Sequence, residues 1–249
     1  MTELRKKVID NIAPVTVDEC VYMGNGKTLR EQVLPWKGLK WVAFGDSITD
    51  ASLTQADRKY CDIIAEKTGI TLVNFGKGGT GYKRREDEGT CFYQRMANIP
   101  SDADIITILG SVNDWSLFNS NIDSYDGFVQ GSVTDTIENN SLCGYFNKCI
   151  DVAREVAPNA KIGIITPNTS KLSDKYVAMI NETLPSVAKY RGIPCLVLSS
   201  VDQLRPNDPI FGANHFYDYN TTGGSIVHPN NAGHEWMYKP ILKFMESII

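Results

Sequence analysis

The chain has 249 residues, a hydrophobic fraction of 42% and a formal net charge of -4. This length suits one α/β domain of ordinary size, and the charge, without a long basic run, argues against a nucleic-acid partner. No stretch is long and apolar enough for a membrane span, and Met1 to Pro14 lacks the apolar core of a signal peptide. The six cysteines lack ligand spacing, so we expect no metal site and interpret them as small buried hydrophobes of a reducing compartment.

The first part of the chain differs from the rest. Lys6 to Asp18 shows no sustained hydrophobic period, Glu19 to Met23 is compatible with a short strand, and Asn25-Gly26 is a favoured turn. We therefore interpret residues 1–36 as an N-terminal arm or linker and residues 37–249 as the folded domain.

From residue 39 onward, apolar runs of β-type residues alternate with helical patterns. Strands are predicted at residues 39–44, 71–75, 103–109, 161–166 and 194–198. Helices are predicted at residues 56–68, 140–157, 173–191 and 231–248. Pro185 should kink or split the third of these helices. Strands that alternate with helices form βαβ units, so we predict a three-layer α/β/α sandwich around a five-stranded parallel sheet.

Polar motifs follow the predicted strands. They are Gly45-Asp46-Ser47, Asn74 to Thr80 and Gly110 to Asp114, with His228-Pro229-Asn230 just before the last helix. Three long connections, at residues 76–100, 111–131 and 200–228, follow strands in the same way. In a parallel sheet the carboxyl ends of the strands meet at one edge, where ligands bind, so we expect these motifs to converge there.

The converging residue types suit acyl transfer. The Ser47 hydroxyl is a weak nucleophile until a base takes its proton, and His228 can do so near neutral pH. The resulting oxyanion needs preorganised donors, which the N–H groups of Ser47 and Gly79 and the side-chain amide of Asn113 would supply. We therefore predict catalytic roles for Ser47, His228, Gly79 and Asn113, although each alone also has a structural explanation, such as a helix cap for Ser47.

At these motifs the chain resembles the SGNH, or GDSL-type, hydrolase family. The matching blocks are Gly45-Asp46-Ser47-Ile48-Thr49, Asn74 to Gly79, Gly110 with Asn113-Asp114, and His228-Pro229-Asn230 with Gly233-His234. The resemblance covers about residues 37–249. It implies a flavodoxin-like fold with strand order 2-1-3-4-5 and esterase or deacetylase activity without a cofactor. Trp36 to Trp41 is more faintly similar to members found in phage-tail and cell-surface proteins.

One position departs from the family pattern. The resemblance implies an aspartate three residues before the histidine, but Ser225 stands there. A backbone carbonyl or the Ser225 hydroxyl would then orient His228, or an acid from the preceding loop would substitute, with Asp218 the first candidate and Asp208 the second. The third reading is a weakened or inactive site. We include Asp218 among the predicted catalytic residues.

Further residues near these blocks form the predicted substrate-binding set: Asp46, Gly78, Asp114 and Tyr82. Of these, Asp46 is also expected to bind loop amides, and Asp114 to hold the asparagine loop. Arg84 and Arg95, beyond the glycine block, are expected to meet a polar substrate. Of the remaining histidines, His234 should pack in the last helix and His215 should lie in a solvated loop.

Together these features predict a serine esterase or deacetylase acting on short-chain, mainly acetyl, esters of a small molecule or glycan. Polar residues in the long connections favour a hydrated substrate such as a carbohydrate: Asn119, Asn121, Asp123, Asp126, Asn214, Asn220 and Thr221. We expect no nucleic-acid or membrane partner and no cofactor. An alternative is a glycan-binding or phage-tail structural module on the same scaffold, because a fold does not guarantee a function.

A dinucleotide-binding loop is a second alternative. Gly76-Lys77-Gly78-Gly79-Thr80-Gly81 satisfies the G-x-G-x-x-G spacing directly after a predicted strand. However, Tyr82 to Asp87 lacks the apolar face of the helix that should follow. The next strand ends in Leu109-Gly110, without the acid that binds a ribose. The spacing alone therefore does not favour a nucleotide cofactor.

Overall fold

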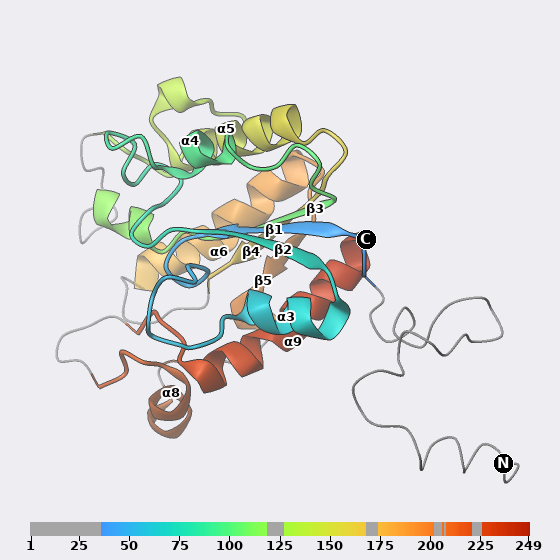
Figure 1. Ribbon diagram of the computed structural model, residues 1–249. Coiled ribbons are helices and arrows are strands. Elements are labelled where there is room, and N and C mark those ends of the chain that lie inside the picture. The colour runs from blue at the N-terminus through green and yellow to red at the C-terminus, as the bar shows by residue number, and fades with distance from the viewer. Residues whose placement is uncertain (1–35, 119–126, 168–173, 202–205, 207, 221–225) are drawn as a thin grey trace, which may run out of the picture.

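The computed structural model describes residues 36–118, 127–167, 174–201, 206, 208–220 and 226–249 (Figure 1). The predicted arm at residues 1–36 lies outside this part except for its last residue, and so does the predicted strand at Glu19 to Met23. Trp36 itself is buried, and its N–H donates to the carbonyl of Thr68 at 3.1 Å. Trp36 therefore packs against the folded domain.

A five-stranded parallel sheet forms the centre of the molecule. Its strands are β1 (Lys40–Gly45), β2 (Thr71–Gly76), β3 (Ile105–Leu109), β4 (Lys161–Thr166) and β5 (Cys195–Val197). They lie in the order β2-β1-β3-β4-β5, which confirms the predicted fold class and strand order. Gly45 pairs with Gly76 on one side and with Leu109 on the other. The three strands that carry the predicted motifs therefore end at the same level.

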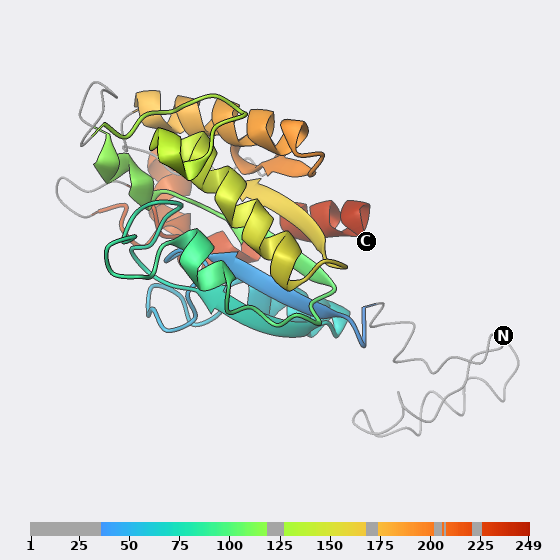
Figure 2. The same ribbon diagram turned by 90° about the horizontal axis from the view of Figure 1, so that it is seen from above.

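Helices cover both faces of the sheet. They are α3 (Tyr60–Thr68), α4 (Phe92–Met96), α5 (Leu142–Val156), α6 (Asp174–Tyr190), α7 (Leu198–Val201), α8 (Pro209–His215) and α9 (Asn231–Ile248), with the 3-10 turns η1 (Asn113–Leu117) and η2 (Ile137–Asn139). Figures 1 and 2 show α3 and α9 on one face and α4, α5 and α6 on the other. The result is the predicted three-layer arrangement.

Burial explains why the central strands read as continuous apolar runs. Residues 41–44 of β1 and 105–109 of β3 are buried because both strands are covered on two sides. Within this core the indole N–H of Trp41 donates to the Thr107 hydroxyl at 2.9 Å, which satisfies both polar groups. At the start of α5, the Ser141 side chain accepts the N–H of Gly144 and so caps the helix.

Three local predictions differ from the structure. The helix predicted at residues 56–68 begins only at Tyr60. The segment before it is held by the N–H of Asp57, which donates to the Asn231 side chain at 2.7 Å. Helix α6 continues across Pro185, so of the two predicted effects of this proline, a kink or a split, the split does not occur. Helices α4 and α8 lie inside connections predicted as loops, because elements of 5 and 7 residues are too short to show a helical period.

Among the residues that the structure describes, no helix combines the length and apolar character that crossing a membrane requires.

Candidate active site

The segment after β1 forms a tight turn that carries Ser47. The Asp50 amide donates to the Asp46 carbonyl at 3.0 Å, and the Ile48 amide donates to the Asp46 carboxylate at 3.0 Å. A Cβ atom on Gly76 would lie 2.3 Å from the Asp50 nitrogen, so β2 can end against this turn only with glycine at its last position. The turn holds Ser47 at the carboxyl edge of the sheet with 7% of the residue exposed.

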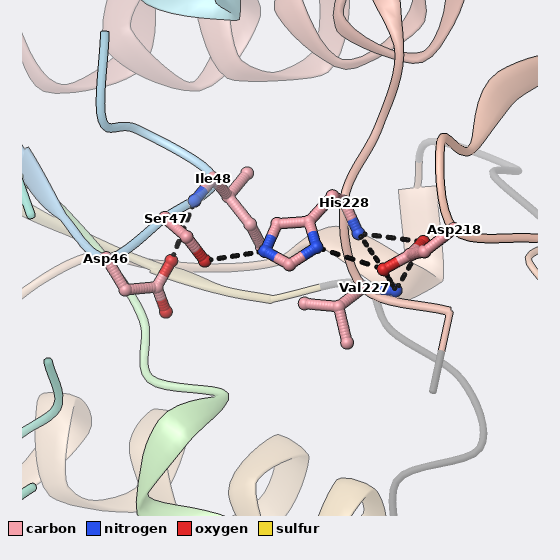
Figure 3. Close-up of polar contacts among 6 residues, drawn as sticks. All are labelled: Asp46, Ser47, Ile48, Asp218, Val227 and His228. Carbon is pink, nitrogen blue, oxygen red and sulfur yellow. Dashed lines mark hydrogen bonds and ion pairs between the residues drawn. The ribbon is translucent and has the colours of Figure 1, made fainter. Parts of the chain in front are cut away.

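A histidine and a carboxylate continue from Ser47 in one line (Figure 3). The Ser47 hydroxyl lies 2.9 Å from Nε2 of His228, and Nδ1 of His228 lies 2.9 Å from Oδ2 of Asp218. Neutral imidazole accepts the hydroxyl proton at Nε2 when its own proton is on Nδ1, and the carboxylate stabilises that tautomer. Asp218 also accepts the backbone N–H groups of Val227 at 3.1 Å and His228 at 3.2 Å. The carboxylate is therefore fixed against both the ring and the backbone of the histidine.

Local pairing of two segments brings Asp218 to His228. Phe216 and Pro229 form an antiparallel bridge, and the Tyr217 N–H donates to the His228 carbonyl at 2.9 Å. Asp218 directly follows the first of these segments, so its side chain reaches the histidine of the second. This pairing supplies the acid that the usual family position lacks in this chain.

The other groups considered for orienting the histidine differ in position. Asp208 lies at the N-cap of α8, where its carboxylate accepts the N–H groups of the second and third following residues at 2.9 and 2.7 Å. It is therefore occupied as a helix cap. Ser225 is the last of residues 221–225, which lie outside the described part of the chain. Of the two candidate acids, the structure places Asp218 on the imidazole.

Three candidate oxyanion donors lie in the segments that follow β1, β2 and β3. Gly79 has φ +74°, a backbone region that favours glycine. The side-chain amide of Asn113 donates to the Thr80 carbonyl at 2.9 Å and retains a second hydrogen. Among the described residues of the chain, no acceptor is found for the backbone N–H groups of Ser47 and Gly79. These three donors can stabilise an oxyanion that forms at this edge.

The carboxylates of Asp46 and Asp114 are fully buried, which corrects their predicted contact with substrate. Asp46 accepts the N–H groups of Ile48 and, at 3.2 Å, Val112, and so ties the serine turn to the segment after β3. Burial raises its pKa to about 6. Asp114 accepts three successive backbone N–H groups, of residues 82–84, at 2.8, 3.0 and 2.8 Å, and burial raises its pKa as well. Both acids hold loops in place through these hydrogen bonds, the role also expected for them.

Tyr82 and Gly78 also differ from the predicted substrate-binding set. The Tyr82 ring is fully buried against Phe92 and Phe146, with ring centres 4.9 and 5.2 Å apart, so it cannot contact a bound substrate. The Gly78 N–H donates to the Asp50 carboxylate at 2.8 Å and is therefore not available to a ligand. The apolar surroundings of Tyr82 come from α4, which begins ten residues later, and from α5, which lies far from it in sequence.

Arg95 serves the fold rather than facing a substrate, contrary to prediction. Its guanidinium donates to the carbonyls of Phe75 at 2.6 Å and Gly45 at 2.9 Å, the last but one residue of β2 and the last residue of β1. It donates further to the Thr80 hydroxyl at 3.1 Å, and lies over the Phe44 ring at 4.4 Å. Arg95 therefore joins the two strand ends beneath the site, a role that no sequence motif signals.

The two remaining histidines have structural surroundings. His234 is buried in the first turn of α9, as predicted, and its Nδ1 accepts the Tyr60 N–H at 3.2 Å. Burial lowers the pKa of His234 to about 3, so the ring is neutral. His215 ends α8 and stacks on Phe211 with ring centres 3.8 Å apart. In the described ranges, no group of three or more His, Cys, Asp or Glu side chains is arranged to hold a metal ion.

The described geometry, a parallel α/β sheet with a Ser-His-Asp line at its carboxyl edge, is that of a hydrolase fold. The model of the GDSL-like lipase/acylhydrolase family matches residues 43–236. The chain belongs to this family, and family membership assigns it to the hydrolases that act on esters. A search of curated proteins found no match.

Solved structures share the fold at low sequence identity. A protein from Lactobacillus plantarum is 22% identical with a TM-score of 0.66, over 86% of this chain and 99% of its own. A possible lipase from Chitinophaga pinensis DSM 2588 is 16% identical with a TM-score of 0.59, over 84% and 98%. A family two carbohydrate esterase from Clostridium thermocellum, in complex with cellohexaose, is 14% identical with a TM-score of 0.51, over 85% and 65%.

Proposed function

We propose that the protein is a serine esterase that removes short acyl groups, principally acetyl, from a glycan or other small hydrated alcohol. The observation that carries this proposal is the unbroken line from Ser47 through His228 to Asp218, with 2.9 Å at each step. Such a line activates a hydroxyl because the base is within reach of its proton and is itself oriented by an acid.

The reaction has two halves. Ser47 Oγ attacks the ester carbonyl carbon while its proton passes to Nε2 of His228, and Asp218 stabilises the imidazolium that forms. The N–H groups of Ser47 and Gly79 and the Asn113 amide stabilise the tetrahedral oxyanion. When the intermediate collapses, the alcohol leaves with the proton from His228 and the acyl group stays on Ser47. A water molecule, activated by His228, then releases the carboxylic acid and restores the serine.

Two observations support a glycan as the alcohol. One solved neighbour is a carbohydrate esterase in complex with cellohexaose. In this chain, Trp115 and Tyr217 are exposed at 45% and 62%, two residues after Asn113 and one before Asp218. Exposed aromatic rings beside a site present an apolar face with a polar tip, which suits the mixed surface of a sugar. The polar residues at 119–126 and 221 that favoured a carbohydrate lie outside the described residues.

The competing hypothesis is a catalytically weakened glycan-binding or phage-tail module on the same scaffold. It was motivated by Ser225 at the usual place of the acid, and the contact between Asp218 and His228 weakens that motive. The two hypotheses differ in the reactivity of Ser47, because an inactive site does not activate the hydroxyl.

A fluorophosphonate probe and a series of esters test the proposal. We expect the wild-type protein to be labelled at Ser47 and to hydrolyse acetyl esters, including acetylated sugars, faster than long-chain esters. Ser47→Ala should lose both labelling and turnover and still fold, as judged by circular dichroism. A wild-type protein that neither reacts with the probe nor cleaves any ester would contradict the proposal, and a preference for long acyl chains would overturn the glycan assignment.

A further inference from the structure

Two arginines, Arg85 and Arg95, contact the glycine loop of residues 76–81 beside Ser47. Only Arg95 makes several hydrogen bonds that hold the fold together. Arg95 is held by four protein acceptors, including the carbonyls of Gly45 and Phe75. Arg85 has a single acceptor among the described residues, the Glu88 carboxylate at 3.3 Å. A guanidinium has five N–H donors, so most of the donors of Arg85 remain for another partner.

The Arg85 guanidinium lies against Gly79, the glycine of the proposed oxyanion hole. A Cβ atom on Gly79 would lie 3.0 Å from Nη2 and 3.2 Å from Cζ of Arg85, so the guanidinium fills the space that a side chain would take. A Cβ atom on the preceding glycine, Gly78, would lie 3.8 Å from Cβ of Ser47. The two-glycine segment therefore separates Arg85 from the nucleophile by only the thickness of the backbone.

The backbone conformation of Arg85 is also unusual. Its φ is 67°, a left-handed conformation that non-glycine residues seldom adopt and that costs free energy. Strained residues of this kind cluster at sites where a side chain must be held in one place. In this conformation the charged side chain of Arg85 points toward Gly79. It is 38% exposed.

The ion pair with Glu88 does not account for this arrangement. The Glu88 side chain is 53% exposed, and the contact is a single hydrogen bond between residues three apart. Exposed pairs of this type contribute little and exchange readily with solvent or ligand. Of the two other acids in this segment, Glu86 accepts the hydroxyls of Tyr93 at 3.1 Å and Tyr145 at 2.7 Å, and Asp87 is exposed to solvent. Arg85 therefore remains able to bind an anion.

We propose that Arg85 is a substrate-binding residue that recognises a carboxylate carried by the substrate next to the ester, as in an acetylated uronic-acid glycan. The planar fork of the guanidinium matches a carboxylate in two parallel hydrogen bonds. A singly charged carboxylate suits one guanidinium that already has Glu88 nearby, whereas a dianionic phosphate is usually held by several cations. This inference rests on the proposed esterase function and adds the charge class of its substrate.

Acetate release from two matched substrates tests the inference: acetylated galacturonate oligosaccharides and acetylated xylose oligosaccharides of the same length. In Arg85→Gln, the ratio of kcat/KM for the acidic over the neutral substrate should fall roughly tenfold, mainly through KM, as expected for one lost hydrogen-bonded charge pair. Arg85→Lys should restore part of the ratio, because it keeps the charge without the fork. Arg58→Gln is the matched control: Arg58 is also an exposed arginine paired with one nearby carboxylate, that of Glu66 in α3, and the ratio should stay close to wild type.

A ratio that Arg85→Gln leaves at the wild-type value would overturn the inference while leaving the esterase proposal intact. Failure of the wild-type protein to cleave ortho-nitrophenyl acetate or either glycan would instead count against the esterase proposal. Binding then decides on Arg85 separately. In calorimetry with Ser47→Ala, the acidic oligosaccharide should bind more weakly once Arg85→Gln is added, and equal affinity would again overturn the inference.

Discussion

Oδ2 of Asp218 lies 2.9 Å from Nδ1 of His228, although the two residues are ten positions apart and the usual family position of the acid holds a serine. The carboxylate also accepts two backbone N–H groups from the segment that carries the histidine. Orientation of the imidazole and support of its loop thus come from one side chain. In the proposed acyl transfer, the charge that forms on His228 has its counter-ion already in place.

Asp218→Asn should therefore lower kcat by roughly 10²- to 10⁴-fold, because an amide no longer stabilises the imidazolium or fixes its tautomer. The substrate series for acetyl esters measures the effect, with melting temperature as the check on folding. Asp208→Asn is the matched control, since Asp208 caps α8 and does not touch the histidine. It should keep near wild-type turnover and lose about 1 kcal/mol of stability at most. Full activity in Asp218→Asn would exclude Asp218 as the orienting acid.

The positions of the proposed catalytic motifs at the strand ends could be predicted from sequence because each motif is local. Ser47, Gly79 and Asn113 each follow a strand whose apolar run is visible, and parallel strands must end at a common edge. Asp218 could be named only as a candidate, since its contact with His228 depends on the pairing of two loop segments. No residue pattern within the loop of residues 200–228 specifies that pairing.

The predicted substrate-binding roles were wrong for a reason related to that given for Asp218: they depend on contacts between segments, which the sequence does not specify. A side chain in a loop is expected to face solvent, but helices and backbone amides of other segments can cover it, and the sequence alone does not show which ones will. Tyr82 is buried by residues of α4 and α5, and Asp114 by the three amides that it accepts. Arg85 is the opposite case, a proposed substrate-binding residue that the sequence did not indicate. Nothing in its residue type signals a left-handed backbone.

Removal of the side-chain donor of the proposed oxyanion hole should be costly for catalysis. Asn113→Ala should lower kcat by about 10²- to 10³-fold with a smaller change in KM, because the lost hydrogen bond forms mainly in the transition state. Steady-state kinetics with one acetyl ester measures both parameters. Asn98→Ala, an exposed asparagine elsewhere, is the control and should be indistinguishable from wild type. Equal kcat in Asn113→Ala and wild type would remove Asn113 from the oxyanion hole.

The buried carboxyl of Asp46 should make stability depend on pH. Its pKa is about 6 in the folded protein against 3.8 ordinarily, so the folded state binds the proton more tightly and loses stability as pH rises through this window. Relative to Asp46→Asn, which does not titrate, the free energy of unfolding of wild type should fall by about 2 kcal/mol between about pH 4 and pH 7. Urea unfolding at each pH measures this. A difference between the two proteins that stays constant with pH would contradict the raised pKa.

The opposite sign is expected for His234, whose pKa is about 3 in the folded protein against 6.5 ordinarily. Below pH 6.5 the unfolded chain binds the proton and the folded protein does not, so stability is lost as pH falls. His234→Asn keeps an acceptor for the Tyr60 N–H but does not titrate, and it costs stability at neutral pH through the lost ring. Acidification to about pH 4.5 should destabilise wild type by about 3 kcal/mol more than this variant in urea unfolding. Equal losses in the two proteins would mean that the buried imidazole becomes protonated without cost, contrary to its burial against Tyr60.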